Sequence, residues 1–306
     1  MYKRMLVPLD GSELAEVVFP YAKELAGRLD LDLVFLHVYS PAESELRPMH
    51  RAYIEHLAEL AGRQSQEVQE RTGIQPGGND IKTRGELAVG YPSEEILRYA
   101  DENDIDVILI ATHGRSGVTR WAMGSVADAV ICASKVPVLL VGAGIPEEIV
   151  YDKWPTRTIL VPLDGSELAE SVLPHVEALA KQRGAELVDV VLLRSCEFPI
   201  IPSYDIYGAI LTPKIVDEME ATCRRVAEQY LAGVQKRLED VGLKVRPEVL
   251  VGSPANGIVD YANRHPFNLI VMATHGRSGS TRWVMGSVTD RVVHGVSSPV
   301  LIVRPR

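Results

Sequence analysis

Short apolar runs alternate along the chain with segments in which apolar residues recur at helical spacing. Residues 5–9 form the first run, and a helical pattern follows it at Leu14, Val17, Val18, Tyr21 and Leu25. The next run, residues 31–39, is apolar almost throughout, as in a strand of a parallel sheet that is covered on both faces. This alternation predicts an α/β fold.

The rest of the first 143 residues continues in the same way. Ser12 is predicted to cap the first helix, and Gly27 and Asp30 are predicted to end it. Further helices are expected at 44–72, 93–99 and 125–134, and further strands at 81–89, 106–111 and 137–141. Strands that alternate with helices predict a parallel sheet with right-handed crossovers.

The chain contains this unit twice. Residues 6–16 and 160–170 are identical at all eleven positions, and residues 111–126 match 273–288 at fourteen of sixteen. A period this long indicates whole domains rather than solenoid repeats. We expect domains at 1–143 and 156–306, joined by a linker at 144–155. In the second domain, a long insert is expected at 195–241 and strands at 158–163, 186–193, 244–251, 269–273 and 299–303.

The sixteen-residue match carries the candidate chemistry. Each copy follows an apolar run and precedes a helix-like segment, which is the arrangement that turns backbone N–H groups toward an anion. Both copies are therefore predicted to be phosphate loops, although such a loop can also be only a turn. The residues that would serve the anion are Gly114, Arg115, Arg120, Gly124 and Ser125, with Gly276, Arg277, Arg282, Gly286 and Ser287 in the second copy.

Acidic residues end the first strand of each unit. Asp10 and Asp164 are acceptors suited to a ribose hydroxyl, an adenine amino group or a metal ion. In an open α/β sheet, ligands bind beyond the carboxyl ends of the strands, where these residues and the loops converge. A turn with a helix cap is an equally good interpretation of Asp10. For His113 and His275 a structural role is preferred, because no partner carboxylate or nucleophile stands at a telling spacing.

Composition restricts the partners. A net charge of −9 gives little electrostatic support for nucleic-acid binding. No apolar run approaches the roughly 20 residues of a membrane helix, and no signal peptide is recognised. The cysteines, Cys132, Cys196 and Cys223, are far apart and odd in number, which fits neither a disulfide framework nor a zinc site. A cytoplasmic location is expected.

These motifs resemble those of the universal stress protein family. Its nucleotide signature, G-x-x-G, nine residues, then G-[S/T], corresponds here to Ala111-x-x-Gly114, nine residues, then Gly124-Ser125, with the same spacing from Ala273 to Ser287. The opening V-P-L-D-G-S, the G-x-P turns at Gly90 and Gly252, and the closing P-V-L-L-V and P-V-L-I-V are also similar. The resemblance covers essentially the whole chain, twice, so the chain looks like a tandem member.

The resemblance implies two doubly wound domains, each a five-stranded parallel sheet in the order 3-2-1-4-5 with helices on both faces. It also implies that ATP, with or without Mg²⁺, binds at the carboxyl ends of the strands, although some members bind none. Adenine would contact Asp10 and the backbone of Val38 near Pro8, ribose would face Ala111, and phosphates would meet Gly114, Gly124, Ser125 and Val126. The second site would use Pro162, Asp164, Leu193, Ala273, Gly276, Gly286, Ser287 and Val288.

Two further implications concern assembly and departures from the signature. The last strands, 138–141 and 300–303, are expected to pair within the chain as a pseudo-dimer, and a homodimer is also compatible. Ala111 and Ala273 replace the first glycine of the signature, which would weaken binding if that position needs a positive φ or a contact closer than a methyl group allows. If the position only ends the strand, alanine is harmless. Leu192 is taken to replace His37.

The expected function is that of a nucleotide-dependent regulatory or stress-response protein with an unknown protein partner and little or no hydrolysis. No carboxylate or glutamine is placed to activate water, and no lysine follows the glycine as in a Walker loop. The alternative is a nucleotide-free interaction protein, favoured by the two alanines. The insert at 198–214 is compatible with a partner surface, although a loop that covers the pocket or packs on the sheet is the preferred interpretation. An enzyme resembling an ATP pyrophosphatase fits less well, because Pro-Leu-Asp-Gly-Ser stands where a serine- and glycine-rich loop is expected.

Overall fold

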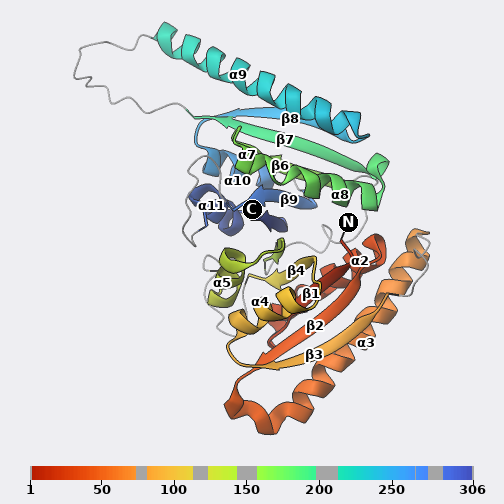
Figure 1. Ribbon diagram of the computed structural model, residues 1–306. Helices are drawn as coiled ribbons and strands as arrows, with labels where there is room; N and C mark the ends of the chain where they lie inside the picture. Colours follow the sequence, from red (N-terminus) through yellow and green to blue (C-terminus); the bar gives the residue numbers. More distant parts are fainter. Residues whose placement is uncertain are drawn as a thin grey trace.

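One sheet runs through the whole molecule. The computed structural model describes residues 2–73, 81–112, 123–142, 157–197, 213–265, 267–274 and 285–304. Within them, ten strands lie in the order β3-β2-β1-β4-β5-β10-β9-β6-β7-β8 (Figure 1). Each half of the chain therefore has the order 3-2-1-4-5 with parallel neighbours, which confirms the predicted fold.

The strands lie close to their predicted positions. In the first half they are β1 (Arg4–Pro8), β2 (Asp32–Tyr39), β3 (Thr83–Val89), β4 (Val107–Ala111) and β5 (Val138–Val141). In the second half they are β6 (Arg157–Pro162), β7 (Val188–Cys196), β8 (Lys244–Val251), β9 (Leu269–Ala273) and β10 (Val300–Val303). The largest difference is at β7, which extends three residues beyond its predicted end at Leu193.

Helices cover both faces of the sheet. One apolar core lies under α1 (Glu13–Glu16), α2 (Phe19–Leu29), α3 (Arg47–Thr72), α7 (Glu167–Glu170), α8 (Leu173–Arg183) and α9 (Pro213–Asp240). The other lies under α4 (Pro92–Glu102), α5 (Ser125–Ala133), α10 (Pro254–Arg264) and α11 (Ser287–Gly295). Two short 3₁₀ helices, η1 (Pro41–Leu46) and η2 (Ala185–Leu187), connect elements. None of the helices in these ranges is long and apolar enough to cross a membrane.

The two halves meet through their last strands. β5 and β10 are antiparallel neighbours, with Leu139 opposite Leu301 at the centre of the pairing. Both side chains are buried. This pairing, called the seam below, confirms the predicted intrachain pseudo-dimer, and it removes an open edge from each half-sheet. The homodimer and the extent of the 144–155 linker stay predictions.

The first helical segment differs from the predicted single helix. Ser12 does cap α1, because its Oγ accepts the N–H of Ala15 at 3.2 Å. The chain then breaks, and α2 starts at Phe19 with Pro20 in its first turn. Proline lacks an N–H and clashes with the preceding turn in a helix interior, so it fits best where a new helix begins.

Gly27 does not end a helix, contrary to the sequence prediction. It lies inside α2, which continues to Leu29, and Asp30 then ends the helix in the left-handed conformation at φ 55°. A Cβ atom on Gly27 would lie 2.6 Å from the carbonyl oxygen of Ser65 and 2.7 Å from Cβ of Val68, both on α3. The glycine is therefore needed for the close approach of α2 and α3.

Gly27→Ala should destabilise the protein although alanine is the better helix former. The added methyl group meets the backbone of α3, and overpacking of this kind costs about 1–3 kcal/mol. Gly233→Ala in α9 is the matched control, because a Cβ there meets nothing within 4 Å. It should raise the free energy of unfolding by about 0.5–1 kcal/mol. Urea unfolding measures both changes, and equal stabilisation by both substitutions would contradict the packing argument.

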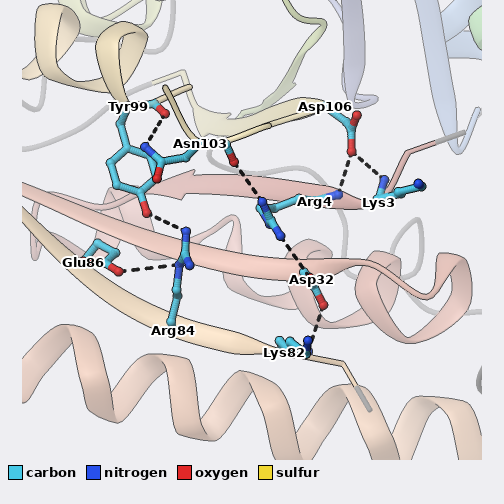
Figure 2. Close-up of polar contacts among 9 residues, drawn as sticks. All are labelled: Lys3, Arg4, Asp32, Lys82, Arg84, Glu86, Tyr99, Asn103 and Asp106. Carbon is cyan, nitrogen blue, oxygen red and sulfur yellow. Dashed lines mark hydrogen bonds and ion pairs between the residues drawn. The ribbon is translucent and has the colours of Figure 1, made fainter. Parts of the chain in front are cut away.

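A polar network fixes the amino ends of the strands in the first half. Figure 2 shows the guanidinium of Arg4 donating to the carbonyl oxygen of Asn103 at 2.9 Å and lying 3.6 Å from the carboxylate of Asp32. The N–H of Lys82 donates to the same Asp32 side chain at 3.0 Å. Asp106 accepts the backbone N–H of Arg4 at 2.9 Å. These contacts join β1, β2, β3 and β4 at the edge opposite their carboxyl ends.

The two halves use different side chains to accept the backbone N–H groups at this edge of the sheet. Asp106 also accepts the backbone N–H of Lys3, at 2.7 Å. In the second half, Asn268 occupies the position before the fourth strand and accepts the N–H of Thr158 at 2.9 Å. A side-chain oxygen, rather than a negative charge, is therefore the shared requirement.

Asp106→Ala should lower the free energy of unfolding by about 1–2 kcal/mol, because two backbone N–H groups lose their acceptor. Asp106→Asn reproduces the arrangement of the second half and should stay within about 0.5 kcal/mol of the wild type. Urea unfolding of the three proteins checks this. An asparagine variant as unstable as the alanine variant would show that the charge matters and the hydrogen bonds do not.

Candidate functional site

A cavity of ≈ 330 Å³ lies beyond the carboxyl ends of β1, β2 and β4 in the first half. Its walls come from these strand ends and from the N-terminal turns of α4 and α5. The sequence-predicted residues that line it are Pro8, Asp10, Val38, Ala111, Gly124, Ser125 and Val126. The structure thus brings together, in one hollow, residues that lie more than a hundred positions apart in the chain.

Asp10 forms a side-chain turn at the end of β1. Its Oδ1 accepts the N–H of Ser12 at 3.0 Å and the Oγ–H of the same residue at 2.6 Å. Asp164 makes the same pair of contacts with Ser166, at 2.9 and 2.6 Å. The sequence left open whether Asp10 forms a turn or contacts a ligand. The structure shows the turn, and it also places Asp10 in the wall of the cavity.

The N-terminus of α5 supplies the anion-binding geometry. Gly124 is the N-cap residue, with φ −64° and ψ 144°, and no side chain caps the helix. Its own N–H donates to the carbonyl oxygen of Thr112 at 2.7 Å, so this amide holds the loop rather than a ligand. The N–H groups of Ser125 and Val126 lie in the first turn, where a helix lacks internal acceptors and the macrodipole favours negative charge.

The second half repeats this helix start. Gly286 is the N-cap of α11 with φ −63° and ψ 145°, again without a side-chain cap. Its N–H donates to the carbonyl oxygen of Thr274 at 2.9 Å. Ser287 and Val288 therefore occupy the same positions as Ser125 and Val126. Thr112 and Thr274, which hold the two loops, were not singled out from the sequence, although both stand in the matched stretch.

The two alanines that replace the signature glycine are ordinary strand residues. Ala111 pairs with Val141 and Ala273 pairs with Val303 in parallel ladders. Among the described residues other than glycine, positive φ angles occur at Asp30 and Asp104, so neither alanine has one. The sequence left open whether this position needs a positive φ. It does not, so the backbone conformation does not require glycine at either position.

The sequence comparison of the two second strands is wrong by two residues. Pro8 of β1 pairs with Leu36, and Pro162 of β6 pairs with Leu193. Leu193 therefore corresponds to Leu36 and not to Val38. The apolar residues of the two strands alone do not fix their register, and the hydrogen bonds to the neighbouring strand reveal the shift.

Arg194, rather than Leu192, replaces His37, and Ser195 matches Val38. The correspondence of Tyr39 with Cys196 supports this register. The N–H of Gly90 donates to the carbonyl oxygen of Tyr39 at 3.1 Å, and the N–H of Gly252 donates to the carbonyl oxygen of Cys196 at 2.9 Å. Ser195 is therefore the residue that sequence reasoning missed in the second site. A polar residue directly after a leucine in both strands was the available signal.

The two sites consequently carry different side chains beside the aspartate turn. His37 is buried, and its Nδ1 contacts the carbonyl oxygen of Leu9 at 2.9 Å while its ring stacks on His50 at a centroid distance of 4.5 Å. The guanidinium of Arg194 lies 4.6 Å from the ring centroid of Tyr230. Its nitrogens also lie against Gly165, 3.1 Å from where a Cβ would stand.

The cysteines are not all far apart in space. Cys196 ends β7, and its thiol lies near that of Cys223 on α9. The pKa of the Cys196 thiol is raised to about 12, mainly by burial and secondly by the neighbouring Cys223. This thiol is therefore protonated at neutral pH, and all three cysteines are free of disulfides.

Several predicted site residues lie outside the described ranges. These are Gly114, Arg115, Arg120, Gly276, Arg277 and Arg282, together with His113 and His275. Their predicted roles stay predictions. Within the described ranges no group of three or more His, Cys, Asp or Glu side chains could hold a metal ion.

Comparison with known proteins agrees with this geometry. Universal stress protein Rv2005c of Mycobacterium tuberculosis is 26% identical over 305 residues, 98% of this chain and 96% of that protein. Universal stress protein MJ0577 of Methanocaldococcus jannaschii is 33% identical over 156 residues, 48% of this chain and 94% of that protein. A universal stress protein structure from Archaeoglobus fulgidus has a TM-score of 0.62 at 19% identity and covers 98% of both chains.

The strongest evidence of descent is that both halves match independently. The model of the universal stress protein family matches residues 1–142 and again residues 155–304. These segments are the two units that the sequence repeats and that the structure joins at the seam. The chain therefore belongs to the universal stress protein family.

Proposed function

We propose that this chain binds an adenine nucleotide, ATP in particular, at the carboxyl ends of its strands and acts as a nucleotide-dependent regulatory protein of the stress response. The observation that carries the proposal is the cavity in which Asp10, Val38 and the first turn of α5 meet. Its volume of ≈ 330 Å³ falls within the roughly 300–1,000 Å³ of small-molecule sites.

One end of the cavity suits a purine base. Pro8, Val38 and Ile96 offer apolar surface to the flat faces of the ring. Asp10 offers a carboxylate, which accepts hydrogen bonds from an amino group or a ribose hydroxyl. Apolar walls with a few oriented polar groups are the usual composition of a cofactor pocket.

The other end suits phosphate. The first turn of α5 presents backbone N–H groups at the positive end of the helix dipole, equivalent to about half an elementary charge. Ser125 adds a hydroxyl donor beside them. The proposed base and phosphate sites thus line one hollow, as a nucleotide requires. Asp164, Ser195 and the start of α11 support the same proposal for the second half.

Slow or negligible hydrolysis is part of the proposal. The carboxylate of Asp10 already accepts two hydrogen bonds from Ser12, which lowers its value as a base for water. Because the described residues include no cluster of metal-binding side chains, Mg²⁺ would be held mainly by the phosphates and water. That is its usual mode of binding beside nucleotides. A regulatory role needs binding and release, and fast chemistry would work against it.

Calorimetric titration of ATP with Mg²⁺ into nucleotide-stripped protein tests the proposal. Two sites per chain are expected, and Gly124→Val and Gly286→Val should each remove one. Valine tolerates the backbone angles of these N-cap positions, but its branched side chain would stand where the phosphates approach.

Gly233→Ala is the control and should keep both sites. Unchanged affinity in a folded double variant would exclude the assigned phosphate sites. Absence of binding to the folded wild type would instead favour the nucleotide-free interaction protein.

Ala111→Gly and Ala273→Gly should change ATP affinity by no more than about threefold, because neither position needs a glycine backbone. The same titration measures this. A gain of tenfold or more, equivalent to about 1.4 kcal/mol, would show that the alanine methyl group obstructs the nucleotide.

A further inference from the structure

A second cavity, of ≈ 130 Å³, lies between the two halves, and residues of both line it. It sits against the seam on the face that α2 and α8 cover, and these two helices contact each other there. In Figure 1 both helices lie close to the N-terminus, on facing sides of the two halves. The cavity is therefore distinct from the nucleotide pocket, which lies beyond the carboxyl ends of the strands.

The lining is predominantly apolar and comes in equivalent pairs from the two halves. Leu139 and Leu301 face each other across the seam, and Leu25 of α2 has its counterpart in Leu179 of α8. Met5 of β1 likewise corresponds to Ile159 of β6. The cavity thus lies between equivalent parts of the two halves, and it is formed by their pairing.

Tyr21 breaks this symmetry. Its counterpart in the second half is His175, whose Nδ1 forms a hydrogen bond with the hydroxyl of Tyr2 at 2.7 Å. The side chain of Tyr21 lines the cavity and is only 7% exposed, and its hydroxyl has no hydrogen-bond partner in the described part of the chain. A buried hydroxyl without a partner is uncommon and costs about 1–3 kcal/mol, so it needs an explanation.

The carboxylate in the lining is paired within the protein, and Arg28 and Arg157 also line the cavity. The carboxylate of Glu24 accepts the guanidinium of Arg28 at 2.8 Å and that of Arg71 at 2.7 Å. Burial raises the pKa of the Tyr21 phenol, against a smaller opposing effect of Arg157. Tyr21 is therefore neutral at physiological pH and can both donate and accept a hydrogen bond.

We propose that this cavity binds a small neutral aromatic molecule carrying one hydroxyl group, a ligand of the phenol class. Its ring would fill the apolar volume and its hydroxyl would pair with Tyr21. The volume is close to the roughly 150 Å³ of an apolar protein cavity that accommodates benzene. Water is a poor occupant, because a buried water needs about two to four polar partners and this lining is mostly carbon.

Such a ligand would contact both halves at once. Its binding would stabilise the packing of α2 against α8 and would be favoured by the paired arrangement of the halves. This inference goes beyond the proposed nucleotide role and does not depend on it.

Fluorine NMR of the full chain with 4-fluorophenol, fluorobenzene and 4-fluorobenzoate tests the proposal. One site per chain is expected, with 4-fluorophenol bound about three- to tenfold more tightly than fluorobenzene and 4-fluorobenzoate bound most weakly. Tyr21→Phe removes one hydroxyl and should abolish the preference for the phenol while leaving fluorobenzene affinity unchanged. A preference that survives in Tyr21→Phe, or tighter binding of the benzoate, would overturn the assignment.

A blocking variant locates the site. Leu179→Trp should fill the cavity and weaken all binding by more than tenfold. Leu57→Trp is its matched control, because Leu57 is equally half-buried against the same core but does not line the cavity. Equal loss in both tryptophan variants, or no binding of any probe to the folded wild type, would refute the site. Titration of ATP into the same samples keeps this outcome separate from the nucleotide proposal.

Discussion

The antiparallel pairing of β5 and β10 is the constraint on which the rest of the molecule depends. Within each half the strands are parallel, so their carboxyl ends share one edge. The antiparallel seam reverses the second half, and the carboxyl ends of the two sets of strands, where nucleotide binding is proposed, therefore lie on opposite edges of one continuous sheet. The same pairing buries two strand edges that would otherwise invite association with another chain. It also brings α2 and α8 together and so creates the apolar cavity between them.

Much of the fold could be predicted from the sequence because the signals were local and repeated. Alternating apolar runs and helical patterns located every strand, and the duplicated stretches located the two units. The failures have different causes. Pro20 divides a helix through its own backbone chemistry, a local signal that the helical spacing of the apolar residues obscured. Gly27 permits a close helix contact, which depends on what packs against the segment rather than on its own pattern. The two-residue shift at β7 likewise became visible only through pairing with β6.

The site was predictable where it rests on the motif and less so where it rests on tertiary contacts. Asp10, Ala111 and Ser125 were found from the sequence, and one cavity brings them together. Ser195 was missed because two apolar strands can be aligned in either register. Gly124 was assigned to phosphate, but its N–H holds the loop through Thr112, and that bond joins a strand end to a helix start. Both halves keep this bond between the strand end and the helix start. The second strands of the two halves differ, because buried His37 in the first half is replaced by Arg194 in the second.

The central claim is that the first turns of α5 and α11 receive the phosphates of a nucleotide. Amide hydrogen exchange at Ser125, Val126, Ser287 and Val288, measured with and without ATP and Mg²⁺, tests it most directly. Exchange at these amides should be slower with ATP, and it should change little along the opposite edge of the sheet near Asp106. Equal exchange in both conditions at a saturating ATP concentration would contradict it.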